Sequence, residues 1–344
     1  MRVGFVYDPI YLEHDTGQHP ENTNRLRAIM RYLERTGPWQ QLEAITPTVA
    51  AVPAIALVHN REYITQVREL AEKGGGQLDA DTVVSAGSYE AARYAAGGAI
   101  RAVEAVVEEQ MDSVFALVRP PGHHALANRG MGFCLFNNIA IAARYALNKY
   151  NLERIAIIDF DVHHGNGTQD AFYNEPKVLY ISVHQSNFYP GTGSIDDTGN
   201  GAARGTTVNI PLPAGCGDSE YVKVFEQVIV PAVRCFNPRL ILVSAGYDAH
   251  WADGLALMQV SITGFARVTG IIKEIAGDMC GGRMVFSLEG GYNLTTLSAS
   301  VRATFEVLLG NKDIEDKLGQ SPFDIKAPDI TALIEQIKGI HNLS

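Results

Sequence analysis

The chain has 344 residues, of which 46% are hydrophobic and 19% are charged, and its formal net charge at pH 7 is −10. This composition predicts a globular protein with a sizeable core, and the excess of acidic residues argues against nonspecific binding to nucleic acid. No apolar segment approaches the length of a membrane span, and the strand-like N-terminus leaves no room for a signal peptide. The four cysteines are scattered without a CxxC pair, which indicates reduced thiols. We therefore expect a soluble cytoplasmic protein, and its oligomeric state stays open.

Apolar runs alternate with segments of helical periodicity along the chain, and no linker of biased composition separates them. This alternation predicts one doubly wound α/β domain over residues 1–344, in which a parallel sheet is flanked by helices on both faces. The predicted strands are 3–7, 114–118, 155–158, 178–184, 207–212, 240–243 and 284–288. The predicted helices are 22–35, 60–73, 85–110, 137–150, 219–236 and 261–276, and two more begin near Thr295 and Asp329.

Two polar segments interrupt the first third of the chain. Residues 13–26, which include His14, are expected to form a surface loop, with the rim of a site as the alternative. Residues 74–87 are expected to form a flexible break followed by an exposed loop. Ser85 or Ser88 is then expected to cap the long helix that follows.

The stretch IAIIDFDVHHGNGT, residues 155–168, places acids and imidazoles directly after a buried strand. Because strand side chains alternate between faces, Asp159, Asp161 and His163 can all point the same way. Burying carboxylates without a partner costs several kcal/mol, so we expect a cation among them, and a metal ion is the simplest candidate. The alternative is a helix N-terminus capped by Asp161, with both histidines as ordinary polar residues.

Polar side chains also follow other predicted strands. In an open parallel sheet, ligands bind beyond the carboxyl ends of the strands, so these side chains are expected to meet at one edge. Side chains of this kind follow four of the predicted strands, and they are Asp161 and His163, His123 and His124, Asp248, and Tyr292.

Asp161, His163 and Asp248 form a three-ligand metal set with an open fourth position, as in a catalytic zinc site. Two of these ligands are carboxylates, which are harder than the usual ligands of structural zinc. The residues alone therefore leave iron(II), cobalt and manganese open.

The remaining polar groups supply a base and a hydrogen-bond donor. A metal lowers the pKa of its bound water toward ~7, and the pair His123–His124 can take the proton. Asp159 and Asn166 are available to orient these two rings. Tyr292 follows a Gly-Gly turn and can donate to a developing oxyanion. Together the groups predict hydrolysis of an amide or a similar carbonyl group.

The motifs RPPGHHA, GFCLFNN, DFDVHHGNGTQ, SAGYDAH and EGGY resemble, in sequence and order, those of the histone deacetylase family of metal-dependent deacylases, including its bacterial acetylpolyamine amidohydrolase relatives. The resemblance spans residues 2–309 and implies an arginase-like α/β fold and a single deacetylase domain. It implies that Asp161, His163 and Asp248 bind zinc and that Tyr292 polarises the substrate carbonyl. It also implies that His124 is the general base and then acid, while His123 is mainly electrostatic and is hydrogen-bonded toward Asp159.

The resemblance further implies sites around the metal. A potassium ion would be bound by Asp159, the carbonyl groups of Asp161 and His163, and Ser182. Phe133 and Tyr189 would be the aromatic walls of an acyl-lysine channel with Gly132 on its floor, and Asp81 would be the rim acid, with Asp79 as the alternative. Ordinary core packing is the alternative for both aromatic residues.

Three positions distinguish this chain within the family that it resembles. Asn166 stands where the class I branch has aspartate, and this neutral partner should leave the pKa of His124 lower than a carboxylate would. Tyr189 replaces a common phenylalanine and places a hydroxyl at the channel mouth. Leu255 stands where the polyamine-selective eukaryotic branch has a glutamate, which weakens the case for that branch's substrate. His184 and His250 are expected to be packing or hydrogen-bonding residues.

The sequence thus predicts a zinc-dependent hydrolase that removes acetyl or other acyl groups from an acylated primary amine. The substrate can be acyl-lysine in a protein, a polyamine or another small amide, and Fe²⁺ or Co²⁺ remain alternatives to Zn²⁺. A ureohydrolase of the arginase kind is a distant alternative, because it would need a binuclear manganese site with more aspartates. A non-catalytic binder is a further alternative, but no metal ligand is missing and Tyr292 is present.

Overall fold

The computed structural model describes residues 2–323 and 325–343. Within them, a sheet of eight strands forms the middle layer, and every neighbouring pair of its strands is parallel. The strands are β1 (Val3–Val6), β2 (Leu42–Ile45), β5 (Ser113–Ala116), β6 (Ile155–Asp159), β7 (Val178–Gln185), β8 (Thr207–Leu212), β9 (Leu240–Ala245) and β10 (Met284–Leu288). Their order is β2-β1-β5-β10-β9-β6-β7-β8, so the predicted parallel sheet is confirmed.

The inner strands β5, β10, β9, β6 and β7 are buried along their whole length. Parallel strands that are covered on both faces have continuous apolar sequences. For this reason the apolar runs in the sequence predicted these strands correctly. Strand β2 lies at the edge of the sheet with two of its residues exposed. It carries no continuous apolar run, and the sequence analysis missed it.

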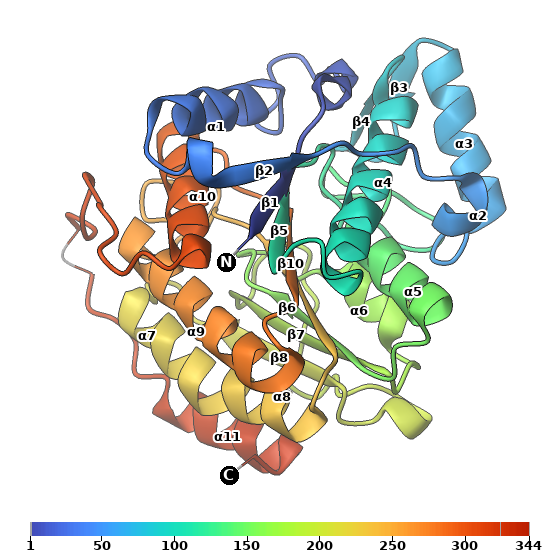
Figure 1. Ribbon diagram of the computed structural model, residues 1–344. Coiled ribbons are helices and arrows are strands. Elements are labelled where there is room, and N and C mark those ends of the chain that lie inside the picture. Colours follow the sequence, from blue (N-terminus) through green and yellow to red (C-terminus); the bar gives the residue numbers. More distant parts are fainter. Residues whose placement is uncertain (1, 324, 344) are drawn as a thin grey trace.

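Helices cover both faces of the sheet, as predicted (Figure 1). One face carries α2 (Val52–Ile55), α3 (Arg61–Glu72), α4 (Ser88–Val107), α5 (Asn138–Tyr150) and α6 (Asn166–Phe172). The other carries α1 (Asn24–Arg35), α7 (Asp218–Val224), α8 (Val230–Phe236), α9 (Ile262–Cys280), α10 (Leu294–Leu309) and α11 (Thr331–His341). Short 3₁₀ helices are Pro9–Glu13, Trp39–Gln41 and Gly201–Ala203.

The predicted helix 219–236 is divided. A π-helical turn, Phe225–Ile229, separates α7 from α8. Pro231 lies at the start of α8 and has no N–H to donate to the preceding turn, so the regular hydrogen-bond pattern cannot continue through it.

Two local predictions about the first third of the chain are wrong. Where a break and a loop were predicted over 74–87, the chain forms an antiparallel hairpin of β3 (Gly75–Gln77) and β4 (Val83–Ser85), and a loop remains only at 78–82, which holds Asp79 and Asp81. Helix α4 begins after Gly87, and no side chain caps it. The Ser88 hydroxyl instead accepts the N–H of Ser85 at 2.6 Å and lies 2.7 Å from His14 Nδ1.

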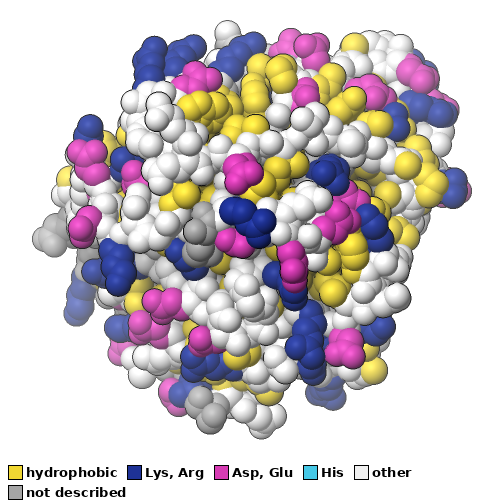
Figure 2. Space-filling model, in the orientation of Figure 1, with side chains coloured by type: hydrophobic (Ala, Val, Ile, Leu, Met, Phe, Trp, Pro, Cys, Tyr) yellow, Lys and Arg dark blue, Asp and Glu magenta, His cyan; other side chains and the backbone are white. Residues whose placement is uncertain are grey.

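The surface is mixed in charge. Acidic and basic side chains are interspersed over the face shown in Figure 2. Among the described residues, no helix combines the length and the apolar character that crossing a membrane requires.

Candidate metal centre and active site

Asp161, His163 and Asp248 meet beyond the carboxyl ends of β6 and β9. Their ligand atoms all lie within 4.8 Å of one another. His163 Nδ1 is 3.2 Å from Asp161 Oδ1 and 3.2 Å from Asp248 Oδ2. Burial lowers the pKa of His163, but its hydrogen bond to Asp161 and the charges of the two carboxylates outweigh this effect and raise the pKa to about 10. The two buried carboxylates therefore create a field that attracts a cation.

Two glycines give the carboxylates room. A Cβ on Gly246 would overlap the Asp161 carboxylate, and a Cβ on Gly290 would overlap Asp248 Oδ2 and lie 2.5 Å from Asp161 Oδ2. Gly290 N–H donates to the same Asp161 oxygen at 2.8 Å, and Val162 N–H donates to Asp248 Oδ1 at 3.1 Å. These contacts fix both carboxylates from the backbone.

The donor set fits a divalent cation. Buried Asp248 Oδ2 accepts no hydrogen bond from the residues that the structure describes, although His163 Nδ1 lies 3.2 Å away. Zinc and other first-row metals bind such a set, which consists of a carboxylate oxygen without a hydrogen bond, a second carboxylate and an imidazole. The alternative in which Asp161 caps a helix is wrong, because α6 begins after Gly165.

His123 and His124 follow β5, and their ring centroids are 4.0 Å apart. His123 Nδ1 is 3.1 Å from Asp159 Oδ2, and His124 Nδ1 is 2.8 Å from Asn166 Oδ1. Burial and the neighbouring His123 and His163 hold the pKa of His124 well below its usual range. Burial also lowers the pKa of His123, but the charges of Asp159 and Asp161 outweigh it and raise the pKa to about 10. The two adjacent rings thus favour opposite protonation states.

Phe133 is held in a left-handed backbone conformation with a φ of 69°, and its neighbour Gly132 has a φ of 55°. A bulky residue in this region costs about 1–3 kcal/mol, so the surrounding structure must hold it there. Phe133 N–H donates to Thr82 Oγ1 at 3.2 Å, and the ring of His19 packs edge-on against the Phe133 ring at 4.5 Å. A Cβ on Gly132 would overlap the ring of His124, so the loop passes directly over that histidine.

Tyr292 and Tyr189 both approach this loop. The Tyr292 ring meets Phe133 edge-on at 5.7 Å, and the Tyr189 ring meets His124 edge-on at 5.1 Å. Tyr189 is 37% exposed, which places it at the surface end of the group. Burial first, and then the charge of Asp81, raises the pKa of Tyr189.

The other predicted residues are also near this edge of the sheet. Ser182 on β7 is the partner of Asp159 on β6, and its hydroxyl lies 2.9 Å from His184 Nδ1. Leu255 donates its N–H to Asp253 at 3.2 Å, and Asp253 in turn contacts Tyr292. His184 and His250 are buried and hydrogen-bonded, as predicted.

Two residues that support Tyr292 were missed by the sequence analysis. Arg25 donates to the carbonyl oxygens of Gly291 at 2.7 Å and Glu289 at 2.5 Å, and its guanidinium lies 5.0 Å from the Tyr292 ring centroid. Asp253 accepts the N–H groups of Tyr292 at 2.6 Å and Asn293 at 2.9 Å. One signal was present for the arginine, because Arg25 falls on the apolar side of α1 with Ile29 and Leu33.

The polar segment 13–26 is not a simple surface loop. His14 is 1% exposed, and its Nε2 lies 3.6 Å from Glu21 Oε2. Glu21 is fully buried between Arg25 and Arg119. Burial raises the pKa of Glu21, but the two arginines outweigh it and lower the pKa to about 2. The surface-loop prediction is therefore wrong for His14, which is buried against Glu21 and against Ser88, 74 residues away.

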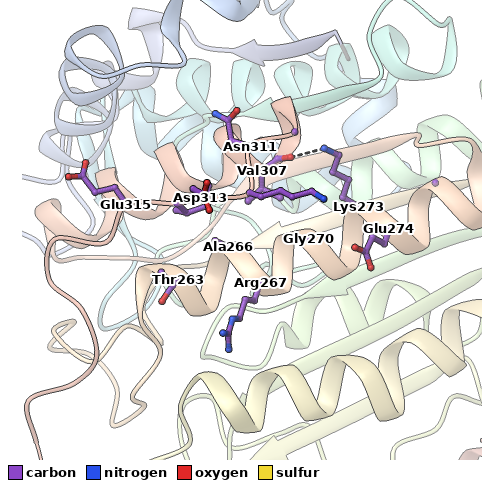
Figure 3. A pocket seen from close by; sticks show the side chains of 14 residues that line it. Thr263, Ala266, Arg267, Gly270, Lys273, Glu274, Val307, Asn311, Asp313 and Glu315 are labelled. Atoms are coloured by element: carbon purple, nitrogen blue, oxygen red, sulfur yellow. Dashed lines mark hydrogen bonds between the residues drawn. The ribbon is translucent and has the colours of Figure 1, made fainter.

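A groove of about 1050 Å³ lies away from this edge, between α9 and the residues that follow α10 (Figure 3). Lys273 crosses it to donate to the carbonyl oxygen of Val307 at 2.7 Å. Its charged side chains have both signs, and they include Arg267, Glu274 and Glu315. None of the predicted site residues lines it.

A parallel α/β sheet whose carboxyl edge holds two buried carboxylates and a cluster of imidazoles is typical of metal-dependent hydrolases. The histone deacetylase domain model matches residues 19–308, and the chain belongs to the histone deacetylase family. The resemblance stated from the motifs is therefore confirmed. The family is generally metal-dependent, and the assignment favours a hydrolase of the deacetylase type over a ureohydrolase.

Curated relatives match nearly the whole chain. "Histone deacetylase 10, chloroplastic" of Oryza sativa subsp. japonica is 42% identical, with 96% of this chain and 79% of the relative covered. A "Probable deacetylase" of Archaeoglobus fulgidus is 42% identical over 86% of this chain and 82% of its own length. "Histone deacetylase-like amidohydrolase" of Pseudomonas aeruginosa is 36% identical over 90% and 86%. The crystal structure of the HDA15 HD domain matches with a TM-score of 0.88 and 35% identity, over 99% of this chain and 96% of that one.

Proposed function

We propose that this histone deacetylase-family hydrolase is a zinc-dependent deacylase that cleaves the amide bond of an acylated primary amine, with acyl-lysine as the leading substrate. One observation carries the proposal. The Asp161–His163–Asp248 cluster lies beside a pair of histidines with opposed pKa shifts, and the Gly132–Phe133 loop over His124 also contacts Tyr292.

Asp161, His163 and Asp248 would hold the Zn²⁺ ion, with Fe²⁺ or Co²⁺ as alternatives. When bound, such an ion polarises the substrate carbonyl and lowers the pKa of its bound water. The field of the two carboxylates and the unshared oxygen of Asp248 support this assignment.

His124 would accept the proton of the attacking water and then donate it to the departing amine. Its lowered pKa keeps the ring neutral at neutral pH, as a base requires, and Asn166 holds its Nδ1. His123, held by Asp159, would add positive charge beside the reacting group. Tyr292 would donate to the oxyanion as the carbonyl carbon becomes tetrahedral.

Gly132, Phe133, Tyr189 and Leu255 would line the substrate channel, and Asp81 would bind the substrate at its rim. Leu255 adds no charge to this channel, which favours acyl-lysine over an acetylated polyamine. An acetylpolyamine or another small amide is the alternative substrate of the same mechanism.

We also propose a structural potassium site. Its ligands would be Asp159, Ser182 and the carbonyl groups of Asp161 and His163, and the pairing of Asp159 with Ser182 across β6 and β7 supports it. A cytoplasmic location stays a prediction, and the Oryza sativa relative is named as a chloroplastic protein.

The test is a turnover screen of the purified protein on acetyl-lysine peptides, longer acyl-lysines and acetylated polyamines, before and after metal removal. Chelation should abolish turnover, and Zn²⁺ or Co²⁺ should restore it. Hydroxamates should inhibit by binding the metal. Asp248→Ala should lose metal, because a three-ligand site cannot lose an anion without a large drop in affinity. Full metal occupancy with normal turnover in that variant would disprove the ligand assignment.

A further inference from the structure

A second group of metal-ligand types lies beside the paired histidines. One ring nitrogen of His123, the sulfur of Cys134 and one carboxylate oxygen of Glu289 lie within 4.8 Å of one another. All three residues are buried, and their exposed fractions are 3%, 0% and 0%. They come from three separate parts of the chain: the exit of β5, the loop before α5 and the exit of β10. The proposed mechanism uses neither the thiol nor this carboxylate.

Glu289 differs from the other buried glutamate near the site. Glu21 is paired with Arg25 and Arg119, and these cations lower its pKa to about 2. Glu289 Oε2 accepts the N–H groups of Gly122 at 2.7 Å and His123 at 3.2 Å, and Glu289 Oε1 accepts the Ser244 hydroxyl at 3.2 Å, but no lysine or arginine of the described residues pairs with it. Burial raises its pKa to about 7. A buried carboxyl group without a lysine or arginine partner is a place where a bound cation would be stabilised.

We propose that His123, Cys134 and Glu289 form a second, weaker site for a thiophilic divalent cation such as Zn²⁺, and that filling this site inhibits the enzyme. The binding part of this proposal is independent of the proposed function, and only the inhibition rests on it.

The ligand types favour a borderline-soft cation. Thiolate, imidazole and carboxylate together are a zinc set, and a harder ion such as Mg²⁺ would not be expected to select a thiolate. Zinc–ligand distances of about 2.0–2.3 Å place tetrahedral ligands roughly 3.3–3.8 Å apart, so these atoms need to approach by only about 1 Å. The Cys134 thiol is held by a weak hydrogen bond to the Gly132 carbonyl at 3.3 Å, which a metal bond would replace.

The second site should bind less tightly than the cluster at Asp161. The Cys134 thiol must lose its proton to bind, and burial first, then the charge of Glu289, raises its pKa well above the usual value. Binding therefore releases the thiol proton, and the ring nitrogen of His123 that binds the cation must also be free of a proton, so binding is favoured as the pH rises.

Inhibition follows from the position of His123. His123 Nδ1 lies 3.1 Å from Asp159 Oδ2, and the His123 ring centroid lies 4.0 Å from that of His124. A cation bound to a ring nitrogen of His123 would therefore stand beside the residue that the proposed function makes the general base. It would compete with the contacts that hold the His123 ring in place, so the paired rings would lose the arrangement that the mechanism uses.

The experiment titrates Zn²⁺ into the protein that already holds one equivalent, with bound metal measured by equilibrium dialysis and activity measured in parallel. The wild type should take up a second equivalent and lose activity. Cys134→Ser should take up one equivalent, and its inhibitory Zn²⁺ concentration should rise by about tenfold or more. Cys235→Ser is the matched control, because this cysteine is exposed and lies outside the cluster, and it should behave like the wild type.

Cobalt gives a readout that does not depend on turnover. The ligands at Asp161 include no sulfur, so a sulfur-to-cobalt charge-transfer band should appear only with the second equivalent of Co²⁺ and should be absent in Cys134→Ser. If that variant does not fold, Glu289→Gln is used instead. It keeps a hydrogen-bond acceptor and removes the anionic ligand, so the second equivalent of Co²⁺ and its band should appear only at a higher Co²⁺ concentration than in the wild type. A second equivalent that binds without this band, or equal inhibition of Cys134→Ser and wild type, would overturn the proposal. A protein that shows the band but turns over no acylated amine would instead contradict the proposed function and leave the cation site standing.

Discussion

Gly290→Ala tests whether the approach of the backbone to the two carboxylates sets the metal affinity. The new Cβ would lie 2.5 Å from Asp161 Oδ2 and would overlap Asp248 Oδ2. Because a relaxed contact needs about 3.5 Å, the carboxylates must retreat by roughly 1 Å. Metal sites hold their ligand distances within about 0.2 Å, so this displacement cannot be absorbed. We expect the Zn²⁺ affinity to fall by about 10²-fold or more, which is about 2.7 kcal/mol, with a parallel loss of activity at limiting metal.

The assay is competition for Zn²⁺ with a chelator of known affinity, with circular dichroism to verify the fold. Gly290 does not have a positive φ, so alanine adds no backbone strain there. Gly254→Ala is the matched control, because a Cβ on Gly254 meets no atom within 4 Å, although it lies in the loop that supports Tyr292. A Gly290→Ala protein with wild-type metal affinity would refute the reasoning.

Three further substitutions test the supporting residues. Asn166→Asp should raise the pKa of His124 and move the acid limb of the kcat/KM profile to higher pH, and an unchanged profile would argue against His124 as the base. Arg25→Lys loses the forked contacts to the loop before Tyr292 and should lower kcat by about 10–10²-fold with full metal content; a kcat close to wild type would remove its positioning role. Burial raises the pKa of Asp253 to about 6, so the folded state keeps a proton that the unfolded state has lost. Unfolding free energy from urea titrations should therefore fall by up to about 3 kcal/mol as the pH rises from ~4 to ~6, and Asp253→Asn should lack this part of the fall.

The sequence was sufficient for the features that depend on local pattern. The apolar runs predicted the inner strands. The rule that ligands bind beyond the carboxyl ends of parallel strands predicted that the polar side chains after four strands lie at one edge of the sheet. These side chains follow β5, β10, β9 and β6, which are consecutive neighbours in the sheet. This order could not be predicted, since it depends on how each helical crossover passes over the sheet.

Features that depend on distant partners were missed. Arg25 contacts Gly291, which is 266 residues away, and His14 contacts Ser88, which is 74 residues away. The relation of Cys134 to Glu289 is of the same kind, because neither lies in a spacing typical of a metal site. Short, half-exposed strands such as β2 were missed because they carry no continuous apolar run.

The most direct measurement of the central claim is kcat for Tyr292→Phe in the metal-loaded protein. This change deletes one hydroxyl that the mechanism assigns to the oxyanion, so kcat should fall by roughly 10²–10³-fold while metal content and KM change little. Tyr247→Phe is the control, because its hydroxyl bonds only to Thr304 at 2.8 Å among the described residues, and its loss should reduce stability rather than kcat. A Tyr292→Phe enzyme within a few-fold of wild type on its best substrate would contradict the mechanism.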